Sequence, residues 1–240
     1  MAATAPGIPA QQPESFASDF AGMGSFFIDP AGAAKRVHSK WFWVGPAIVV
    51  SIVSLIAGIM MTPIVQHAIE SMPVPPNANP EQFQKGIAMS VTIQRIAVYF
   101  APIIVLAMMA IQALVIWGTS SVLAVNASFR SIFNLVAGGS LISLLASIAT
   151  LVILKSKGEV NSTAELRPPL GLDIFLGEDA NKALAGFLGY FSVFEIWWIV
   201  MVALTFSIAF RTSKGKGFAA IAPLVLLSLG LRVVGAIFQR

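Results

Sequence analysis

Residues 41–64 read WFWVGPAIVVSIVSLIAGIMMTPI, an apolar run without a charged side chain. A hydrocarbon core about 30 Å thick is crossed by roughly 20 helical residues, because each residue advances a helix by about 1.5 Å. The run is therefore long enough to cross a bilayer. Four further runs that are nearly free of charge follow along the chain, at about 96–117, 132–154, 186–210 and 218–238. The sequence predicts an all-α, polytopic membrane bundle of five transmembrane helices.

The composition agrees with a membrane protein. Of the 240 residues, 57% are hydrophobic and only 11% are charged, whereas a soluble globular domain carries about 25% charged residues. The net charge of +4 comes from bases scattered near the ends of the runs, without the basic face interleaved with aromatic residues that is typical of nucleic-acid binding. We expect these basic side chains to contact the lipid bilayer, and we expect no nucleic-acid partner.

Basic residues also indicate the orientation. They gather before the first run and in the short segment between the last two runs: Lys35, Arg36, Lys40, Arg211, Lys214 and Lys216. Lysine and arginine beside a membrane span favour the cytoplasmic side. The sequence therefore predicts a cytoplasmic N-terminus and a C-terminus outside.

The segments outside the runs differ in character. Residues 1–25, mostly small and polar, are predicted to form a disordered tail ahead of a membrane domain over 26–240. Aspartate is a preferred N-cap residue and proline is preferred at the first position of a helix. Asp29 and Pro30 therefore predict the start of a short amphipathic helix at the cytoplasmic interface. Within the longest loop, the apolar tract 170–176 is expected to dip into the outer interface or to cap the bundle.

Small residues and prolines inside the runs predict how the helices pack. Small residues let helix backbones approach closely in lipid, and two sets of them mark helix faces: Ser51, Ser54 and Gly58, then Gly139, Ser143, Ala146, Ser147 and Thr150. We interpret both sets as packing faces. Pro102 and Pro223 are expected to kink their helices.

The strongest local signal is Glu195, an acid deep in the fourth run, where an unpaired carboxylate is costly. Arg232 lies at a similar depth in the next, antiparallel run, and Arg95 is the second candidate partner. The first interpretation is a structural ion pair between Glu195 and Arg232 that holds the two helices in register. A proton-coupled or substrate-binding carboxylate and an unpaired, snorkelling arrangement are the alternatives, although transport sites usually gather several polar groups beside a broken helix.

No motif predicts an enzyme. His38 and His67 fall on opposite sides of the predicted membrane, so they cannot share a metal ion. The chain contains neither the zinc-protease motif His-Glu-x-x-His nor the nucleophile motif Gly-x-Ser-x-Gly, and no phosphate-binding loop. We expect no catalytic, cofactor-binding or metal-binding residue, and no cofactor.

Several tracts resemble bacterial members of the Yip family of five-span membrane proteins. They are the tract 170–176, Phe191-Ser192-Val193-Phe194-Glu195-Ile196-Trp197-Trp198 at the start of the fourth run, and Phe27-Ile28-Asp29-Pro30-Ala31 followed by Trp41, Trp43 and Pro46. The resemblance implies five helices, a cytoplasmic N-terminus, a multi-pass location in a bacterial inner membrane and no known enzymatic activity.

The resemblance also suggests a role. It implies a non-enzymatic accessory or scaffold protein of a membrane transport or export system, with ABC-type export components or further copies of the chain as partners. The small GTPase partners of eukaryotic relatives are not expected, because the N-terminus lacks the Asp-Leu-Tyr-Gly-Pro type of tract. The alternative is a small transporter or channel that uses Glu195.

Overall fold

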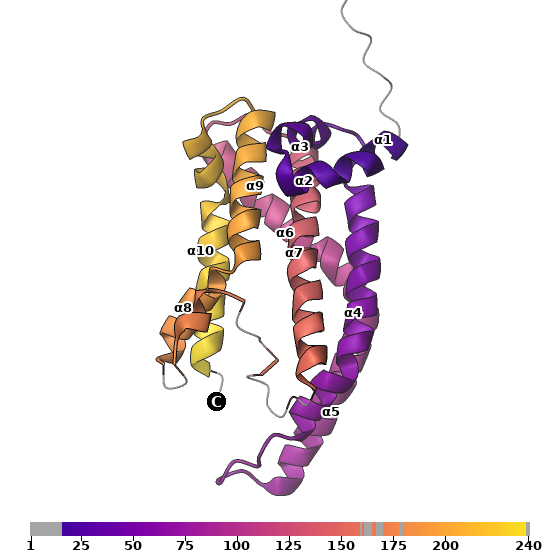
Figure 1. The fold of residues 1–240 in the computed structure, drawn as a ribbon, viewed down its shortest axis with the longest axis vertical. Coiled ribbons are helices and arrows are strands. Elements are labelled where there is room, and N and C mark those ends of the chain that lie inside the picture. Colours follow the sequence, from indigo (N-terminus) through magenta and orange to yellow (C-terminus); the bar gives the residue numbers. More distant parts are fainter. Residues whose placement is uncertain (1–15, 159, 161–164, 167–169, 178–179, 239–240) are drawn as a thin grey trace, which may run out of the picture.

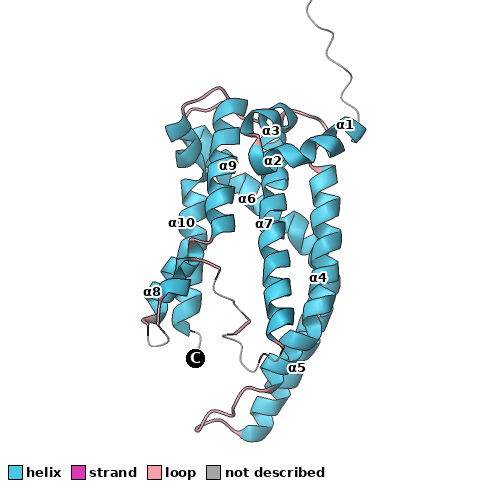
Figure 2. Cartoon of the chain, in the orientation of Figure 1, coloured by secondary structure: helices cyan, strands magenta, loops and turns pink. Residues whose placement is uncertain are grey.

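The computed structural model of the chain describes residues 16–158, 160, 165–166, 170–177 and 180–238. Over these residues the chain forms helices joined by loops (Figures 1 and 2). Four helices are long and apolar enough to cross a membrane, which confirms the predicted all-α polytopic class. They are α4 (Val44–Glu70), α6 (Ala101–Val122), α7 (Phe129–Lys157) and α10 (Lys214–Phe238).

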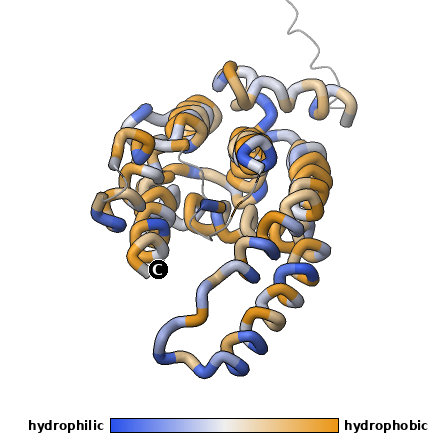
Figure 3. Tube along the Cα trace, turned by 60° about the horizontal axis from the view of Figure 1, so that its bottom comes forward, coloured by the Kyte–Doolittle hydropathy of each residue, from blue (hydrophilic) through white to orange (hydrophobic). Residues whose placement is uncertain are grey.

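Helix α7 is the centre of the bundle, in contact with α4 and α6 and with α9 (Val193–Ala209). Its side chains Leu135, Val136 and Ile142 are fully buried. The outer helices instead expose apolar side chains, as Ile52 of α4 does with 53% of its surface. Figure 3 shows hydrophobic residues over most of the long helices, as expected of helices that face lipid.

The predicted fourth span is not one helix. The structure divides the run 186–210 into α8 (Lys182–Tyr190) and α9, so the prediction of a continuous helix is wrong. At the break, Ser192 has extended backbone angles (φ −75°, ψ 159°), and its Oγ accepts a hydrogen bond from the Glu195 N–H at 3.1 Å. Ser192 therefore starts a new helix inside an apolar run. Both α8 and α9 pack against α10, and in Figure 1 they follow each other along it.

The second span also starts later than predicted. Residues 96–99 belong to α5 (Pro80–Tyr99), and α6 begins after a break at Phe100. Pro102 lies in the first turn of α6, where its missing N–H leaves no intrahelical bond unmade. At Pro102 the structure therefore has a boundary between two helices in place of the predicted kink. Pro223, the second predicted kink position, lies inside α10.

The chain is ordered into helices before the predicted membrane domain begins. Residues 1–15 of the predicted tail lie outside the described residues. From residue 16 the chain forms α1 (Phe16–Ala21), the 3-10 turn η1 (Gly22–Gly24) and α2 (Ser25–Ile28). The tail boundary predicted at residue 25 is therefore too late.

The predicted interfacial helix is present as α3 (Pro30–Val37). The Asp29 carboxylate accepts hydrogen bonds from the N–H groups of Ala31 and Gly32, at 3.1 and 2.9 Å, which confirms its role as N-cap. Figure 1 shows α1 to α3 together across one end of the bundle, where α3 contacts α7 and α9. This N-terminal segment covers the ends of the central helices.

The orientation predicted from the basic residues can be tested by labelling single cysteines in this cysteine-free chain. Three exposed positions are suitable: Lys40 before α4, Asn77 in the α4–α5 loop and Ser213 before α10. In intact cells, we expect a membrane-impermeant maleimide to label cysteine only at position 77. In opened membranes all three should react. Labelling at position 213 from outside would contradict five crossings with the N-terminus in the cytoplasm.

Candidate functional site

The break between α8 and α9 positions Glu195. The residue lies in the first turn of α9, three residues after the capping Ser192. Tyr190 is the last residue of α8, and its hydroxyl donates a hydrogen bond to Glu195 Oε1 at 3.0 Å. Tyr190 is buried, with 5% of its surface exposed. The break therefore brings a carboxylate and a phenol together inside the bundle, at the positive end of the α9 dipole, which favours a negative charge.

A small cavity of about 140 Å³ adjoins this pair. Residues of five helices line it: Gln112 of α6, Ser143 of α7, Tyr190 of α8, Glu195 and Trp198 of α9, and Leu224, Val225 and Ser228 of α10. The cavity has room for more than one water molecule, and its carboxyl, hydroxyl and amide groups could hold water or a small polar ligand. The site is thus a polar space among apolar helices.

Gln112 and Ser143 also line a second cavity, of about 150 Å³, between α4, α6 and α7. Its other polar residues are Ser54, Ser140 and Ser147. Ser54, Ser143 and Ser147, predicted as packing residues, thus line cavities. Gly139 does serve close packing, since a Cβ there would lie 2.8 Å from Val202 Cγ2. Polar groups therefore extend from Glu195 across the bundle to α4.

The predicted ion pair is not formed as a direct contact. Among the described residues, no ion pair within 4.0 Å joins Glu195 to Arg232. Arg232 acts on Glu195 electrostatically from a longer distance. Its guanidinium lies against α8, where a Cβ on Gly189 would be 3.1 Å from Nη2 and 2.8 Å from the carboxylate of Asp173. A similar depth in the membrane did not identify the partner of Glu195, because the residue that bonds to Glu195 directly is Tyr190.

The remaining predicted residues have other positions. Arg95 donates a hydrogen bond to Gln66 of α4 at 3.0 Å, and among the described residues it makes no ion pair with Glu195 within 4.0 Å. The tract 170–176 forms η2 (Leu172–Phe175), which packs against α8, and Gly171 makes an antiparallel bridge with Ser192. The tract therefore packs beside the break between α8 and α9, and its two expected roles, in the outer interface or as a cap on the bundle, stay predictions.

The sequence does not predict Tyr190, Gln112 or Ser228 as neighbours of Glu195. One signal was available, since Ser192-x-x-Glu195 has the serine and glutamate spacing of a helix capping box. It indicates a helix start inside the run 186–210. No comparable signal exists for Gln112 or Ser228, which reach the cavity only because α6 and α10 pack there.

The contacts predict that Glu195 is coupled more strongly to Tyr190 than to Arg232. We expect a double-mutant cycle of Tyr190→Phe with Glu195→Gln to give a coupling free energy of about 1 kcal/mol, because hydrogen bonds to charged groups contribute about 1.5–3 kcal/mol and glutamine keeps part of that. Unfolding of the purified protein in detergent would measure it. The matched cycle of Arg232→Gln with Glu195→Gln should give a smaller value. A larger coupling to Arg232 would restore the ion-pair interpretation.

The part of the chain that the structure describes holds no group of three or more histidine, cysteine, aspartate or glutamate residues that could bind a metal ion. The Glu195 site presents one carboxylate with hydroxyl and amide neighbours. Chemically, this arrangement can bind a proton, a small cation or a polar solute.

Comparison with known proteins gives the family. No curated protein and no solved structure matches the chain. The family model described as the Yip1 domain matches residues 23–235. The match runs from η1 into α10 and includes both helices of the broken span, together with Glu195 and Arg232. This multi-pass membrane protein therefore belongs to the Yip1 domain family.

Proposed function

We propose that this Yip1 domain protein is a non-enzymatic membrane protein that binds a proton or a small cation at Glu195, as part of transport through the bundle. The observation that carries the proposal is the break between α8 and α9, which places the Glu195 side chain in the wall of a polar cavity. Discontinuous helices whose ends meet polar groups are typical of transporter binding sites. Tyr190, Ser143 and Ser228 supply hydroxyl groups in the same cavity.

Charge supports the same proposal. A carboxylate among membrane helices is costly unless it is neutralised or paired. In the described part of the chain, its direct polar contact is the neutral Tyr190 hydroxyl, and no basic group reaches ion-pair distance. A bound proton or cation would neutralise the carboxylate, and exchange of that ion would be the elementary step of transport.

Proton flux into vesicles tests this proposal. The purified protein is reconstituted into liposomes that contain a pH-sensitive dye, and an inside-negative potassium diffusion potential drives protons inward. We expect flux above that of protein-free liposomes, and loss of the excess in Glu195→Gln. Glu81→Gln is the matched control, because Glu81 is exposed and paired with Lys85 on α5. Equal flux in Glu195→Gln and the parent protein would rule out proton transport through Glu195; repeating the assay with a cation-sensitive dye tests cation transport.

The second candidate function is an accessory or scaffold role in a membrane transport or export system, with ABC-type components or another copy of the chain as partner. The α4–α5 hairpin favours it, because in Figure 1 this hairpin extends beyond the other helices. Its helix α5 exposes Met89 and Ile93, with 65% and 55% of their surfaces accessible. Such a surface is available to a partner.

Site-specific photo-cross-linking in native membranes distinguishes the scaffold role. A photoreactive residue in place of Met89 should cross-link to an export component or a second copy. The matched position is Leu226 of α10, which is 66% exposed on the bundle itself and should reach lipid. Equal cross-linking from both positions would mean that the hairpin has no specific partner.

A further inference from the structure

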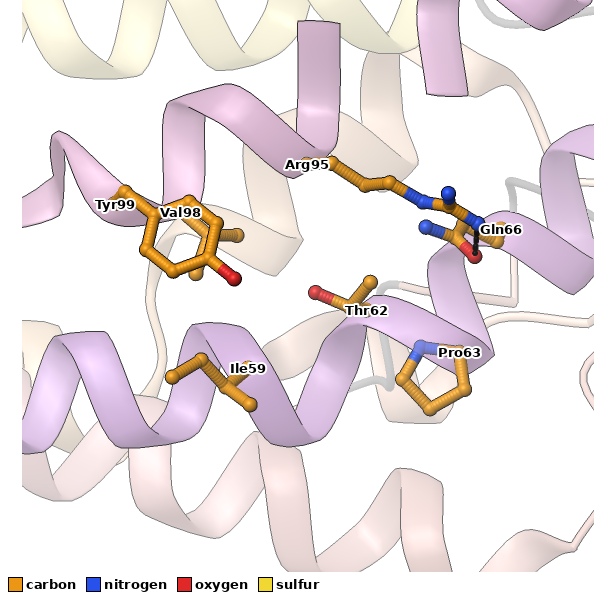
Figure 4. Close-up of a pocket in the computed structure, with 7 residues that line it drawn as sticks. All are labelled: Ile59, Thr62, Pro63, Gln66, Arg95, Val98 and Tyr99. Carbon is orange, nitrogen blue, oxygen red and sulfur yellow. Dashed lines mark hydrogen bonds between the residues drawn. The ribbon is translucent and has the colours of Figure 1, made fainter. Parts of the chain in front are cut away.

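A groove with basic and apolar parts lies between α4 and α5, and it shares no lining residue with the Glu195 cavity. Its volume is about 390 Å³. Figure 4 shows its lining residues, four from α4 and three from α5: Ile59, Thr62, Pro63, Gln66, Arg95, Val98 and Tyr99. None of these lining residues is acidic. The groove therefore offers a positive charge without an opposing carboxylate in its wall.

Within the described part of the chain, the Gln66 amide has a donor without a hydrogen-bond partner at this groove. Arg95 Nη2 donates to Gln66 Oε1 at 3.0 Å (Figure 4). This bond fixes the orientation of the amide, because arginine has only donors and requires the oxygen of Gln66. The amide nitrogen Nε2 of Gln66 is buried, and it has no hydrogen-bond partner among the described residues. In Figure 4 this nitrogen lies on the groove side, between Arg95 and Thr62.

The free donors select an anionic oxygen ligand. Arg95 is exposed, and its planar guanidinium has further N–H groups beyond the one bound to Gln66. Phosphate accepts several hydrogen bonds at once and matches the arginine fork. Gln66 Nε2 and the Tyr99 hydroxyl are neutral donors in the same groove, and Figure 4 shows the hydroxyl directed inward. The chemistry therefore fits a phosphate group better than a cation.

The order of the residues along the helices indicates that the phosphate belongs to a lipid. Gln66 lies near the end of α4, whereas Ile59 is two turns further into its apolar span. Helix α5 runs back alongside, so that Val98 lies opposite Gly58, with its Cγ1 3.1 Å from where a Cβ on that glycine would be. The groove is thus polar toward the helix end and apolar toward the interior of the span.

We propose that this groove binds an anionic phospholipid, with its phosphate on Arg95 and Gln66 Nε2 and an acyl chain along Ile59 and Val98. In this arrangement the head group lies near the end of α4, where the Arg95 guanidinium supplies charge-assisted hydrogen bonds to the phosphate. This site is independent of the transport proposed for Glu195.

Lipid titration of the purified full-length protein in detergent, followed by native mass spectrometry, tests the proposal. The probes are dioleoyl phosphatidylglycerol, dioleoyl phosphatidylcholine and inorganic phosphate. We expect phosphatidylglycerol to bind in preference to the other two, and Arg95→Gln to weaken it about tenfold, the factor expected from one lost charge-assisted contact. Gln66→Leu should weaken it less, and Arg95→Lys should retain part of the affinity.

Lys85→Gln is the matched control. Lys85 is an exposed base on the same helix, paired with Glu81 at 2.9 Å and outside the groove. Its loss should leave phosphatidylglycerol binding unchanged. Equal losses in Arg95→Gln and Lys85→Gln would show unspecific attraction to basic residues and overturn the proposal. Binding of inorganic phosphate as tight as that of phosphatidylglycerol would reject a lipid in favour of a free anion.

Discussion

Replacing Asn134 with leucine is expected to release the N-terminal segment from the bundle and to lower the free energy of unfolding by about 3 kcal/mol. Asn134 of α7 is fully buried. Its Nδ2 donates to the carbonyl oxygens of Val37 and Ser39, at 2.9 and 2.7 Å, and its Oδ1 accepts from the Trp43 N–H at 3.0 Å. Leucine would leave all three backbone groups without this partner, and each buried unsatisfied group costs about 1–3 kcal/mol.

Two measurements check this expectation. Unfolding of the purified protein in detergent reports the loss of stability, and limited trypsin digestion reports release of the segment that carries Arg36, which the folded protein holds in an ion pair with Asp19 at 3.3 Å. Asn126→Leu is the matched control, because Asn126 is exposed in the loop before α7. If Asn134→Leu resists trypsin as well as Asn126→Leu does, Asn134 is not what holds the segment.

The substitution Gly217→Ala is expected to force α9 and α10 apart and to lower stability by about 3 kcal/mol, at the upper end of the usual cost of overpacking. Gly217 is buried in the first turn of α10. A Cβ on it would overlap the carbonyl oxygen of Ala203 and the Oγ of Ser207. Ser207 could turn away, but a backbone carbonyl of α9 can move only with its helix.

Gly230→Ala in the same helix is the control. A Cβ at Gly230 meets no atom within 4 Å, so alanine should leave stability unchanged or raise it by up to about 1 kcal/mol through helix propensity. Unfolding of both variants in the same detergent gives the comparison. Similar stabilities for Gly217→Ala and Gly230→Ala would mean that the two helices separate without cost. The close approach of α9 and α10 would then be unimportant for the fold.

These predictions concern the elements that surround the proposed ion site. Helix α9 carries Glu195 at one end, and its other end is held by α10 at Gly217 and by the N-terminal segment through His38, whose Nε2 lies 2.9 Å from the Ala209 carbonyl oxygen. Loosening either contact would free α9 to move relative to the cavity. We therefore expect Gly217→Ala to disturb proton or cation flux as well as stability.

The class of the fold could be predicted from the sequence because hydropathy is a local property. A run of about 20 apolar residues is long enough to cross a membrane whatever its neighbours are. The cap formed by Asp29 and Pro30 was equally predictable, since its hydrogen bonds reach only two and three residues ahead. Gly58 and Gly139 show the close side-chain contacts expected of packing residues.

The site depended on tertiary structure. Hydropathy averages over a whole run, so it could not show that Ser192 starts a new helix there, although Ser192 and Glu195 have the spacing of a capping box. The sequence places Glu195 and Arg232 at similar depths in two consecutive runs. Depth, however, does not determine the direction in which a side chain points from its helix. The break turns Glu195 toward Tyr190, and the packing of five helices adds Gln112 and Ser228 to the same cavity. Such convergence depends on helix rotation and contact between distant segments, which local sequence patterns do not encode.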